Sequence, residues 1–305
     1  MKRRHGVFNL FRVKYLMVTM MDILDVRDLG KNYPAFKLDG VSFSLERGKI
    51  TGFIGRNGAG KTTTLKSVLN FIHPDRGEVR FFNQPFSAAE LEIKQRIGFV
   101  SGGVDYYSKK KIKSITAVTK TFYKNWDDAA YKSFIKMFSL DESKSPSQLS
   151  AGMKVKYALA LALSHNAELL ILDEPTSGLD PVSRDELLEL FMELSSKGTT
   201  ILFSTHITSD LEKCADNIIY IKNGKIIAES EIKAFVKGYR LVEFTGEKPV
   251  ENGVLIGCKR SKNGYTALVR HKDAEKAGYK TDEADLESIM VHIEKETADL
   301  NRSEP

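Results

Sequence analysis

Apolar residues recur along the chain in two patterns, short runs typical of strands and longer stretches with helical spacing. An unbroken run at residues 169–172 and largely apolar runs at 50–54 and 200–204 predict buried strands, as in a parallel sheet covered by helices. Further strands are expected at residues 23–27, 41–45, 78–82, 97–100, 217–221 and 226–229. The last two flank Asn223-Gly224, which is a strong signal for a hairpin.

Helical spacing is found at residues 62–71, 88–95, 112–140, 154–163, 181–194 and 285–296. The stretch 112–140 is rich in aromatic residues, whose spacing favours a buried helix face over a platform for stacking bases: Phe122, Tyr123, Trp126, Tyr131, Phe134 and Phe138. We therefore expect an α/β core with a helical subdomain at about residues 112–165.

The pattern changes after residue 237. Weaker strands are expected at 241–244, 254–258 and 266–270, followed by the helix at 285–296. This region contains no pattern of residues that indicates chemistry. We expect residues 22–237 to form the main domain and residues 238–305 a small accessory region.

A glycine-rich loop follows the strand expected at residues 50–54 and precedes a helix: Gly55, Arg56, Asn57, Gly58, Ala59, Gly60, Lys61, Thr62 and Thr63. This order matches a Walker A phosphate loop. Glycines allow successive backbone N–H groups to face a phosphate, because a Cβ would block both the dihedral angles and the close approach. Lys61 would reach the terminal phosphates and the Thr62 hydroxyl would bind Mg²⁺. A simple strand-to-helix turn is the alternative, and the complete motif favours a nucleotide site.

Two carboxylates, Asp173 and Glu174, follow the run 169–172. Residues at this end of a parallel strand face the crevice in which such sheets bind ligands, and Pro175 disfavours helix at Glu174. The acids could simply cap the next helix, but a phosphate loop in the same chain favours Mg²⁺ binding by Asp173. A lone histidine is more often structural, yet His206 follows the strand at 200–204 and is expected at the same crevice.

Two further segments have an ordinary and a functional interpretation. Ser150 and Gly152 precede the helix at 154–163, where a serine and a glycine either cap the helix or bind an anion. Tyr33 lies in a connection between strands, where its ring would either stack on an adenine or be exposed in a turn. The sequence leaves both alternatives for Tyr33 open.

Composition limits the class of protein. The net charge of +6 and the pI near 9.0 suggest binding to nucleic acid. Most of this excess charge lies in residues 1–21, however, which contain five basic residues and no acidic one. The rest of the chain is nearly neutral, so no basic stripe for nucleic acid is evident. The two cysteines, Cys214 and Cys258, are far apart, which favours a reducing, cytoplasmic setting over disulfides or zinc. No apolar run approaches the roughly 18 residues of a membrane span.

The first 21 residues do not match a secretory signal, because charges interrupt the apolar region and no small-residue cleavage site follows. They could form an amphipathic helix on a membrane surface. We prefer a disordered or misassigned extension, with the true start at Met20 or Met21, because strand-like alternation begins at Asp22.

Together these residues resemble the ATP-binding subunit of a bacterial ABC transporter, of the exporter type with a separately encoded permease. The resemblance covers about residues 22–237, and its motifs occur in the family's order. It includes a signature segment (Leu149, Ser150, Ala151, Gly152 and Met153) and a loop at the subunit interface (Ser177, Gly178, Leu179 and Asp180). It implies an α/β P-loop NTPase fold of the ABC type, with a mixed sheet, an antiparallel β part, a helical subdomain and a small C-terminal appendage.

The resemblance also implies roles for these residues, with ATP and Mg²⁺ as cofactors. Residues 55–63 would hold the phosphates, Tyr33 would stack on adenine, and Thr62 with Asp173 would bind Mg²⁺. Glu174 would polarise the attacking water, and His206 would contact this water and the γ-phosphate. The signature segment would bind the ATP of a second subunit, with Asp180 communicating across the interface.

The implied partners are a second ATP-binding subunit, identical or different, and an integral membrane permease on whose cytoplasmic side the protein would sit. No nucleic acid is expected. Two segments depart from the family. Gly102 replaces the usual Gln or Glu, so that a water would bridge to Mg²⁺, and in the signature Ala151 and Met153 replace the usual Gly and Gln. Similar signatures occur in exporters. The alternatives are an ABC-type ATPase acting on nucleic acid or the ribosome, and a weakly hydrolysing regulator.

Overall fold

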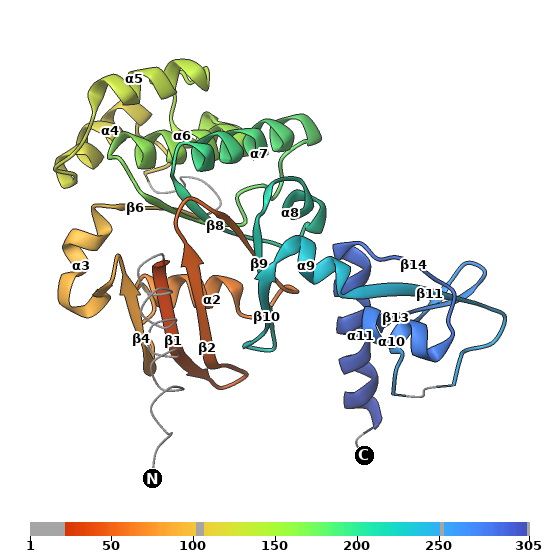
Figure 1. Ribbon diagram of the computed structural model, residues 1–305. Helices are drawn as coiled ribbons and strands as arrows, with labels where there is room; N and C mark the ends of the chain where they lie inside the picture. Colours follow the sequence, from red (N-terminus) through yellow and green to blue (C-terminus); the bar gives the residue numbers. More distant parts are fainter. Residues whose placement is uncertain (1–21, 102–106, 251–252, 304–305) are drawn as a thin grey trace, which may run out of the picture. The chain divides into compact units, whose positions relative to one another are not determined.

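The computed structural model describes residues 22–101, 107–250 and 253–303, which divide into two compact units (Figure 1). Unit 1 consists of the described part of Met1–His206 together with Ile219–Glu229. Unit 2 consists of Ile207–Ile218 and the described part of Ser230–Pro305. The division in space therefore differs from the expected single boundary at residue 237. The range 22–237 remains a prediction for the extent of the ATPase.

Unit 1 begins with an antiparallel sheet in the order β2-β1-β4-β5, formed by β1 (Asp22–Tyr33), β2 (Phe36–Glu46), β4 (Arg76–Phe81) and β5 (Gln84–Pro85). Strands β1 and β2 extend well beyond the expected ranges 23–27 and 41–45. Pairing of β1 with β2 continues across irregularities, including one between Val26 and Leu29, and such bulges interrupt the alternation that a sequence pattern relies on. Their inner residues, including Leu24, Val26 and Leu38, are fully buried in the main core.

The second sheet of unit 1 has six strands in the order β10-β9-β3-β8-β7-β6: β3 (Ile50–Ile54), β6 (Ile97–Ser101), β7 (Leu169–Asp173), β8 (Thr200–Thr205), β9 (Asn217–Lys222) and β10 (Lys225–Glu231). Strands β3, β8, β7 and β6 are parallel, and every residue of β3, β7 and β8 is buried. The largely apolar runs therefore predicted the interior strands correctly. In register, Ser204 lies opposite Asp173, and Thr205 opposite Ile54.

The helices of unit 1 are α2 (Lys61–Val68), α3 (Phe86–Lys94), α4 (Ile112–Thr119), α5 (Asp128–Met137), α6 (Ala151–Ser164) and α7 (Pro181–Ser196), with short 3-10 turns η1 (Lys120–Phe122) and η2 (Pro146–Gln148). The prediction of one helical stretch at 112–140 is wrong. The helix ends near Phe122, and α5 starts afresh because the Asp127 side chain accepts from the N–H groups of Ala129 and Ala130. Phe122 is 70% exposed rather than on a buried face.

Helices α4, α5 and α6 lie together on one side of the six-stranded sheet, next to β6 (Figure 1). Buried hydroxyls join them, since the Thr116 hydroxyl hydrogen-bonds with Tyr131 at 2.8 Å and with Tyr157 at 2.9 Å. Tyr157 also donates to the Ile112 carbonyl at 3.0 Å. These satisfied polar groups fix one arrangement of the three helices.

Unit 2 is built on an antiparallel sheet in the order β12-β13-β11-β14, from β11 (Tyr239–Thr245), β12 (Ile256–Ser261), β13 (Gly264–Arg270) and β14 (Thr281–Glu283). It also contains α8 (Thr208–Cys214), α9 (Ile232–Lys237), α10 (His271–Ala277) and α11 (Leu286–Ser303). Leu268 and Ile289 belong to one apolar cluster, and Val242, Val269 and Ala274 to another. The three longer strands and α11 were predicted, whereas β14, α8, α9 and α10 were missed because they are short.

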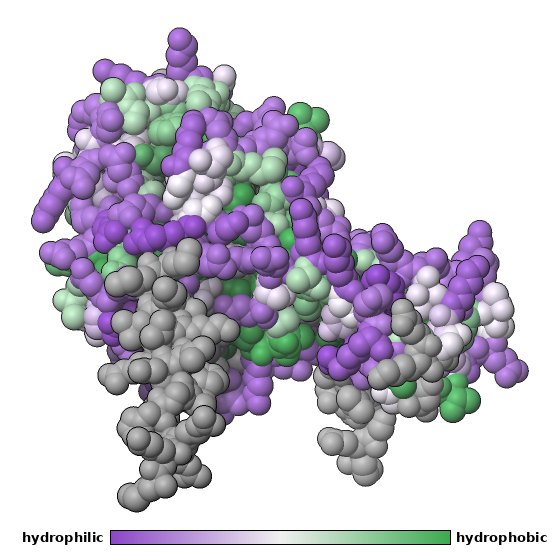
Figure 2. Space-filling model, in the orientation of Figure 1, coloured by the Kyte–Doolittle hydropathy of each residue, from purple (hydrophilic) through white to green (hydrophobic). Residues whose placement is uncertain are grey.

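The face of the molecule in Figure 2 is mostly hydrophilic, with apolar areas interrupted by polar side chains. In the described part of the chain, no helix is both long and apolar enough to span a membrane.

Candidate functional site

The loop between β3 and α2 requires glycine at two positions. At Gly60, where φ is 114°, a Cβ would lie 2.8 Å from Phe36 Cζ and 2.9 Å from Leu38 Cδ2. At Gly55 a Cβ would lie 2.4 Å from the Ile221 carbonyl oxygen. Inside the loop, the Ala59 N–H donates to the Arg56 carbonyl at 3.0 Å. The loop therefore passes tightly against β2 and β9, and its backbone leads directly into the N-terminus of α2.

The Lys61 side chain is folded back over this loop. Its Nζ donates to the carbonyl oxygens of Gly55, at 2.8 Å, and of Arg56, at 3.3 Å. The same ammonium lies 3.4 Å from Glu174 Oε1, and Lys61 is only 5% exposed. A buried positive charge therefore stands at the positive end of a helix, an arrangement that attracts an anion such as phosphate.

Three side chains from three elements meet at the C-terminal end of β7. Asp173, the last residue of β7, accepts at Oδ1 from the Thr62 hydroxyl at 3.1 Å and from the Ser204 hydroxyl at 2.7 Å. Thr62 comes from the first turn of α2 and Ser204 from β8. The sequence predicted Thr62 and Asp173 as ligands of one Mg²⁺, and their side chains meet here. It missed Ser204, because β8 also contains Thr200 and Thr205 and nothing in the pattern distinguishes the hydroxyl of Ser204 from theirs.

Glu174 has a left-handed backbone, with φ of 52°, directly after β7. Its N–H donates to the Ser204 carbonyl at 3.2 Å and to the Ser204 hydroxyl at 3.0 Å. Its carboxylate accepts at Oε2 from Nδ1–H of His206 at 2.9 Å. The structure therefore brings Glu174 and His206 together, as their positions after β7 and β8 predicted, and places the Lys61 ammonium beside Glu174.

Oxygen ligands suit Mg²⁺, and the hydroxyl of Thr62 and the carboxylate of Asp173 supply two of them at the mouth of the phosphate loop. Over the described ranges, no group of three or more His, Cys, Asp or Glu side chains is arranged to hold a metal alone. This fits Mg²⁺, which usually binds through one or two protein ligands and takes the rest from phosphate and water. Thr62 and Asp173 are therefore the residues of this site that could hold Mg²⁺.

The predicted signature segment starts α6. Ser150 is the N-cap, and its Oγ accepts from the Met153 N–H at 3.2 Å. Leu149 is buried, Ser150 and Ala151 are exposed, and a Cβ at Gly152 would touch Leu179 Cδ2 at 3.4 Å. The capping function of Ser150 is thus present, and its exposed position leaves the hydroxyl accessible.

The predicted interface loop lies between Glu174 and α7. The Ser177 N–H donates to the Glu174 carbonyl at 3.2 Å, Gly178 has φ of 73°, and Leu179 is buried. Asp180 caps α7 by accepting from the N–H groups of Val182 and Ser183 and from the Ser183 hydroxyl at 2.6 Å. The Ser183 hydrogen bonds hold the pKa of Asp180 below its usual value, so it is a charged, exposed cap.

Tyr33 lies at the end of β1, is 41% exposed, and pairs in register with Phe36. Phe36 in turn reaches Gly60 of the phosphate loop. The Lys31 ammonium lies 6.0 Å from the centre of the Tyr33 ring. The aromatic ring is therefore exposed on a strand end whose partner strand adjoins the loop. Gly102, the predicted departure from the family, lies outside the described residues.

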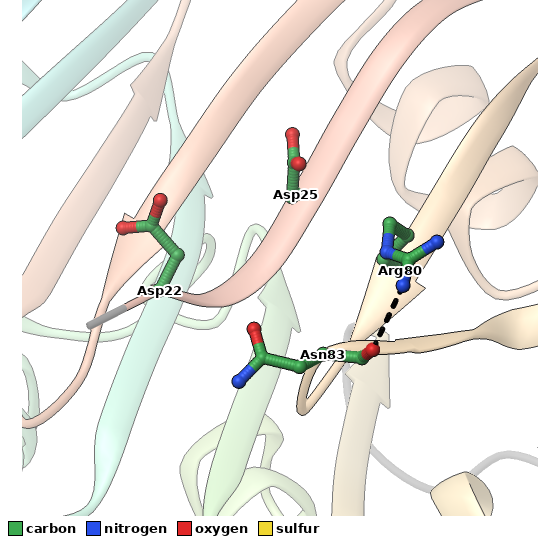
Figure 3. A pocket seen from close by; sticks show the side chains of 4 residues that line it. All are labelled: Asp22, Asp25, Arg80 and Asn83. Atoms are coloured by element: carbon green, nitrogen blue, oxygen red, sulfur yellow. Dashed lines mark hydrogen bonds between the residues drawn. The ribbon is translucent and has the colours of Figure 1, made fainter. Parts of the chain in front are cut away.

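A separate small hollow is lined by Asp22, Asp25, Arg80 and Asn83 (Figure 3). Its volume of about 20 Å³ fits one or two water molecules and excludes a nucleotide. Burial raises the pKa of Asp22 to about 6, assisted by the negative charges of Asp25, Glu46 and Glu229. Protonation of Asp22 is therefore linked to the stability of the fold.

Comparisons with known proteins agree on one family. A family model described as ABC transporter matches residues 38–177. The bacitracin transport ATP-binding protein BcrA of Bacillus licheniformis is 34% identical over 214 residues, which are 69% of this chain and 70% of that protein. The Nod factor export ATP-binding protein I of Burkholderia orbicola (strain AU 1054) is 33% identical over 235 residues, 74% of this chain and 77% of that protein. A solved structure of an ATP-binding subunit of an ABC transporter is similar with a TM-score of 0.63 and 29% identity, covering 70% of this chain and 91% of that one.

Proposed function

Because the chain belongs to the ABC transporter family of ATP-binding proteins, we propose that it is the ATP-hydrolysing motor of a transporter and that the cluster at the ends of β3, β7 and β8 is its catalytic centre. One observation carries this proposal. Lys61, Thr62, Asp173, Glu174 and His206 come from three segments of the chain and are linked by contacts of 2.9 to 3.4 Å. A purely structural cluster would not need a glycine loop, a cation, two acids and a histidine at one sheet edge.

In this proposal the loop of residues 55–63 and Lys61 bind the phosphates of ATP. Lys61 exchanges its contacts with the Gly55 and Arg56 carbonyls for contacts with phosphate oxygens. Thr62 and Asp173 hold Mg²⁺, which neutralises phosphate charge when bound. The exposed ring of Tyr33 stacks on the adenine, which the pairing of Tyr33 with Phe36 beside the loop supports.

Glu174 acts on the attacking water. Its carboxylate accepts from His206 at 2.9 Å and lies 3.4 Å from the Lys61 ammonium, so both neighbours hold it beside the phosphate loop, where it can accept a proton from the water. His206 is also 43% exposed at its side chain, which leaves its other ring nitrogen accessible to the γ-phosphate and the water. Binding of ATP at Lys61 would then release Glu174 from that ion pair.

The chain contains one phosphate loop and one signature segment, so we propose that two subunits enclose ATP between them. The support is the exposure of Ser150, which caps the N-terminus of the 14-residue helix α6, because the positive end of a helix attracts an anion. In the dimer, residues 149–153 bind the γ-phosphate of the opposite subunit, and Ser177, Gly178 and Asp180 line the interface. Because ATP binds the closed pair of subunits more tightly than the open pair, ATP binding drives closure, and this movement is passed to the transporter.

We further propose that this motor sits on the cytoplasmic side of a membrane and drives a separately encoded permease, in the direction of export. The described chain has no spanning helix of its own, and the names of the relatives BcrA and Nod factor export protein I support transport and export. A tagged subunit in its own host should purify, from detergent-solubilised membranes, with a protein that has several hydrophobic spans. Its recovery from the membrane fraction without such a protein would contradict this proposal.

The dimer is tested with the variant Glu174→Gln, which should bind ATP without hydrolysing it. With Mg²⁺ and ATP, light scattering after gel filtration should show a mass twice that of the subunit, and with ADP a single subunit. If the partner is a different chain, that chain must be added. Adding Ser150→Arg to this variant should abolish the dimer, because a long charged side chain would occupy the interface between the two subunits. Nucleotide binding by the single subunit should be kept. A dimer that persists in the double variant would contradict the sandwich.

A further inference from the structure

The two acids of the site are both contacted by one buried hydroxyl, that of Ser204. Ser204 is 0% exposed and lies opposite Asp173 in the parallel register of β7 and β8. Its Oγ donates to Asp173 Oδ1 at 2.7 Å and accepts from the Glu174 N–H at 3.0 Å. The hydroxyl therefore donates its single proton to Asp173, and one of its lone pairs accepts the backbone N–H of Glu174.

The contact with Glu174 offsets a strained backbone. A φ of 52° is unfavourable for a residue with a Cβ, so it persists only where neighbouring groups enforce it. Ser204 does so with two acceptors, because its carbonyl and its hydroxyl share the Glu174 N–H. This backbone conformation directs the carboxylate to His206 and Lys61.

The contact with Asp173 fixes the rotation of its carboxylate. Oδ1 accepts from both Thr62 and Ser204, and within the described residues no hydrogen bond engages Oδ2. One oxygen is thereby held by the protein, and the other remains for a ligand. Removal of Ser204 Oγ would leave Thr62, whose hydroxyl is itself needed as a metal ligand, as the partner of Asp173.

A hydroxyl at this position has a cost that an apolar residue would avoid. The neighbours of Ser204 in β8 include Ile201, Leu202 and Phe203, all fully buried, and a buried hydroxyl is tolerated only when its hydrogen bonds are made. We propose that Ser204 is a positioning residue for ATP hydrolysis, whose hydroxyl orients Asp173 toward Mg²⁺ and holds Glu174 in its working conformation. The proposal rests on the proposed function of this site.

The test compares Ser204→Ala with Thr200→Val. Thr200 is the matched control, because it is also fully buried on β8 and its Oγ1 accepts from the Gly48 N–H at 2.9 Å, at the other end of the strand. Electron paramagnetic resonance measures the affinity of Mn²⁺, as a substitute for Mg²⁺, for the protein–ADP complex. Calorimetry measures ADP binding in EDTA, and circular dichroism checks folding.

In Ser204→Ala we expect Mn²⁺ affinity to fall about 10- to 100-fold, the usual effect of removing a group that orients a metal ligand. ADP affinity in EDTA should change less than about threefold, and kcat at saturating Mg²⁺ should remain reduced because Glu174 has lost an acceptor. Thr200→Val should show none of these changes, and Ser204→Thr should restore Mn²⁺ affinity at least in part. Unchanged Mn²⁺ affinity in Ser204→Ala would overturn the inference, as would an equal loss of ADP affinity in EDTA. Failure of the wild-type protein to bind nucleotide would instead contradict the proposed function.

Discussion

Buried polar side chains lie at the C-terminal ends of the parallel strands in unit 1, and others lie in the small sheet of unit 2. The two groups are arranged differently. In unit 1, Ser204 donates to Asp173, and the Lys61 ammonium lies beside Glu174 while it donates to the Gly55 carbonyl, so charged groups gather beside the phosphate loop. In unit 2, His292 is 3% exposed, and both ring nitrogens are occupied. Its Nδ1–H donates to the Gly257 carbonyl at 2.6 Å, and the Thr266 hydroxyl lies 3.3 Å from Nε2.

The surroundings of the two histidines distinguish a candidate functional site in unit 1 from a structural core in unit 2. The His206 side chain is exposed and hydrogen-bonds to Glu174, so its other ring nitrogen can contact a phosphate or a water. His292 has no unused nitrogen, and burial lowers its pKa, so it serves as a neutral tie between β12, β13 and α11. Substitutions should therefore affect chemistry in unit 1 and stability in unit 2.

The largest effect is expected for Glu174→Gln. Loss of the proton acceptor should lower kcat by about 10²–10⁴-fold, while ATP affinity stays within about threefold. Steady-state turnover and equilibrium binding of a fluorescent ATP analogue measure the two quantities. Glu189→Gln, on the exposed side of α7, is the control and should leave both unchanged. Turnover in Glu174→Gln close to that of the wild type would refute the role of Glu174.

Lys61→Ala should act on binding instead. Loss of a charged donor to phosphate should weaken ATP affinity about 10- to 100-fold, because hydrogen bonds to charged groups contribute about 1.5–3 kcal/mol. Calorimetric titration measures this change. Lys66→Ala, one turn further along α2, removes an equal charge away from the loop and should have little effect. Equal affinities of the Lys61 variant and the wild type would count against the phosphate loop.

His292→Ala should destabilise unit 2 by about 1–3 kcal/mol, because the Gly257 carbonyl loses its partner in a buried place. Hydrogen exchange read by mass spectrometry should show faster exchange in β12 and β13, with ATP turnover within about twofold of the wild type. His271→Ala, at the exposed start of α10, is the matched control. A large loss of turnover in a folded His292 variant would remove the contrast between the two units.

The same histidine predicts a pH dependence. Since burial lowers the pKa of His292 from its ordinary 6.5, the unfolded chain binds this proton more readily than the folded chain. The stability of unit 2 should therefore be complete above about pH 6.5 and fall as the pH drops below it. Exchange rates of β12 and β13 between pH 5 and 7.5, corrected for intrinsic exchange, should show this trend in the wild type and lose it in His292→Ala.

The smallest effect is expected at the hollow of Figure 3. Asp22 has a pKa raised to about 6 from 3.8, so the folded chain binds its proton more tightly than the unfolded chain, and stability falls as pH rises between these values. Asp22→Asn should therefore gain about 1 kcal/mol at pH 7, since solvent in the hollow screens part of the effect, and nothing near pH 4. Urea denaturation at both pH values measures it, with the exposed Asp282→Asn as control. A destabilised variant at pH 7 would contradict this sign.

Much of the fold and most of the site followed from local sequence. The largely apolar runs that became β3, β7 and β8 predicted buried strands, because apolar side chains on both faces of a strand must be covered from water on both sides. The phosphate loop is equally local, since its glycines specify backbone shape. Polar residues directly after parallel strands must meet at one edge, which placed Asp173, Glu174 and His206 together in advance.

Tertiary structure decided what depends on pairs of distant segments. The lengths of β1 and β2 depend on pairing across bulges, and the break before α5 depends on the Asp127 cap competing with continued helix. Ser204 became part of the site only through the register of β8 against β7, and His292 became a satisfied core residue only through Gly257 and Thr266. The sequence shows which polar groups each residue has. Only the folded structure determines the hydrogen-bond partner of a buried polar group, because an unpaired group carries its full desolvation cost only in the packed interior.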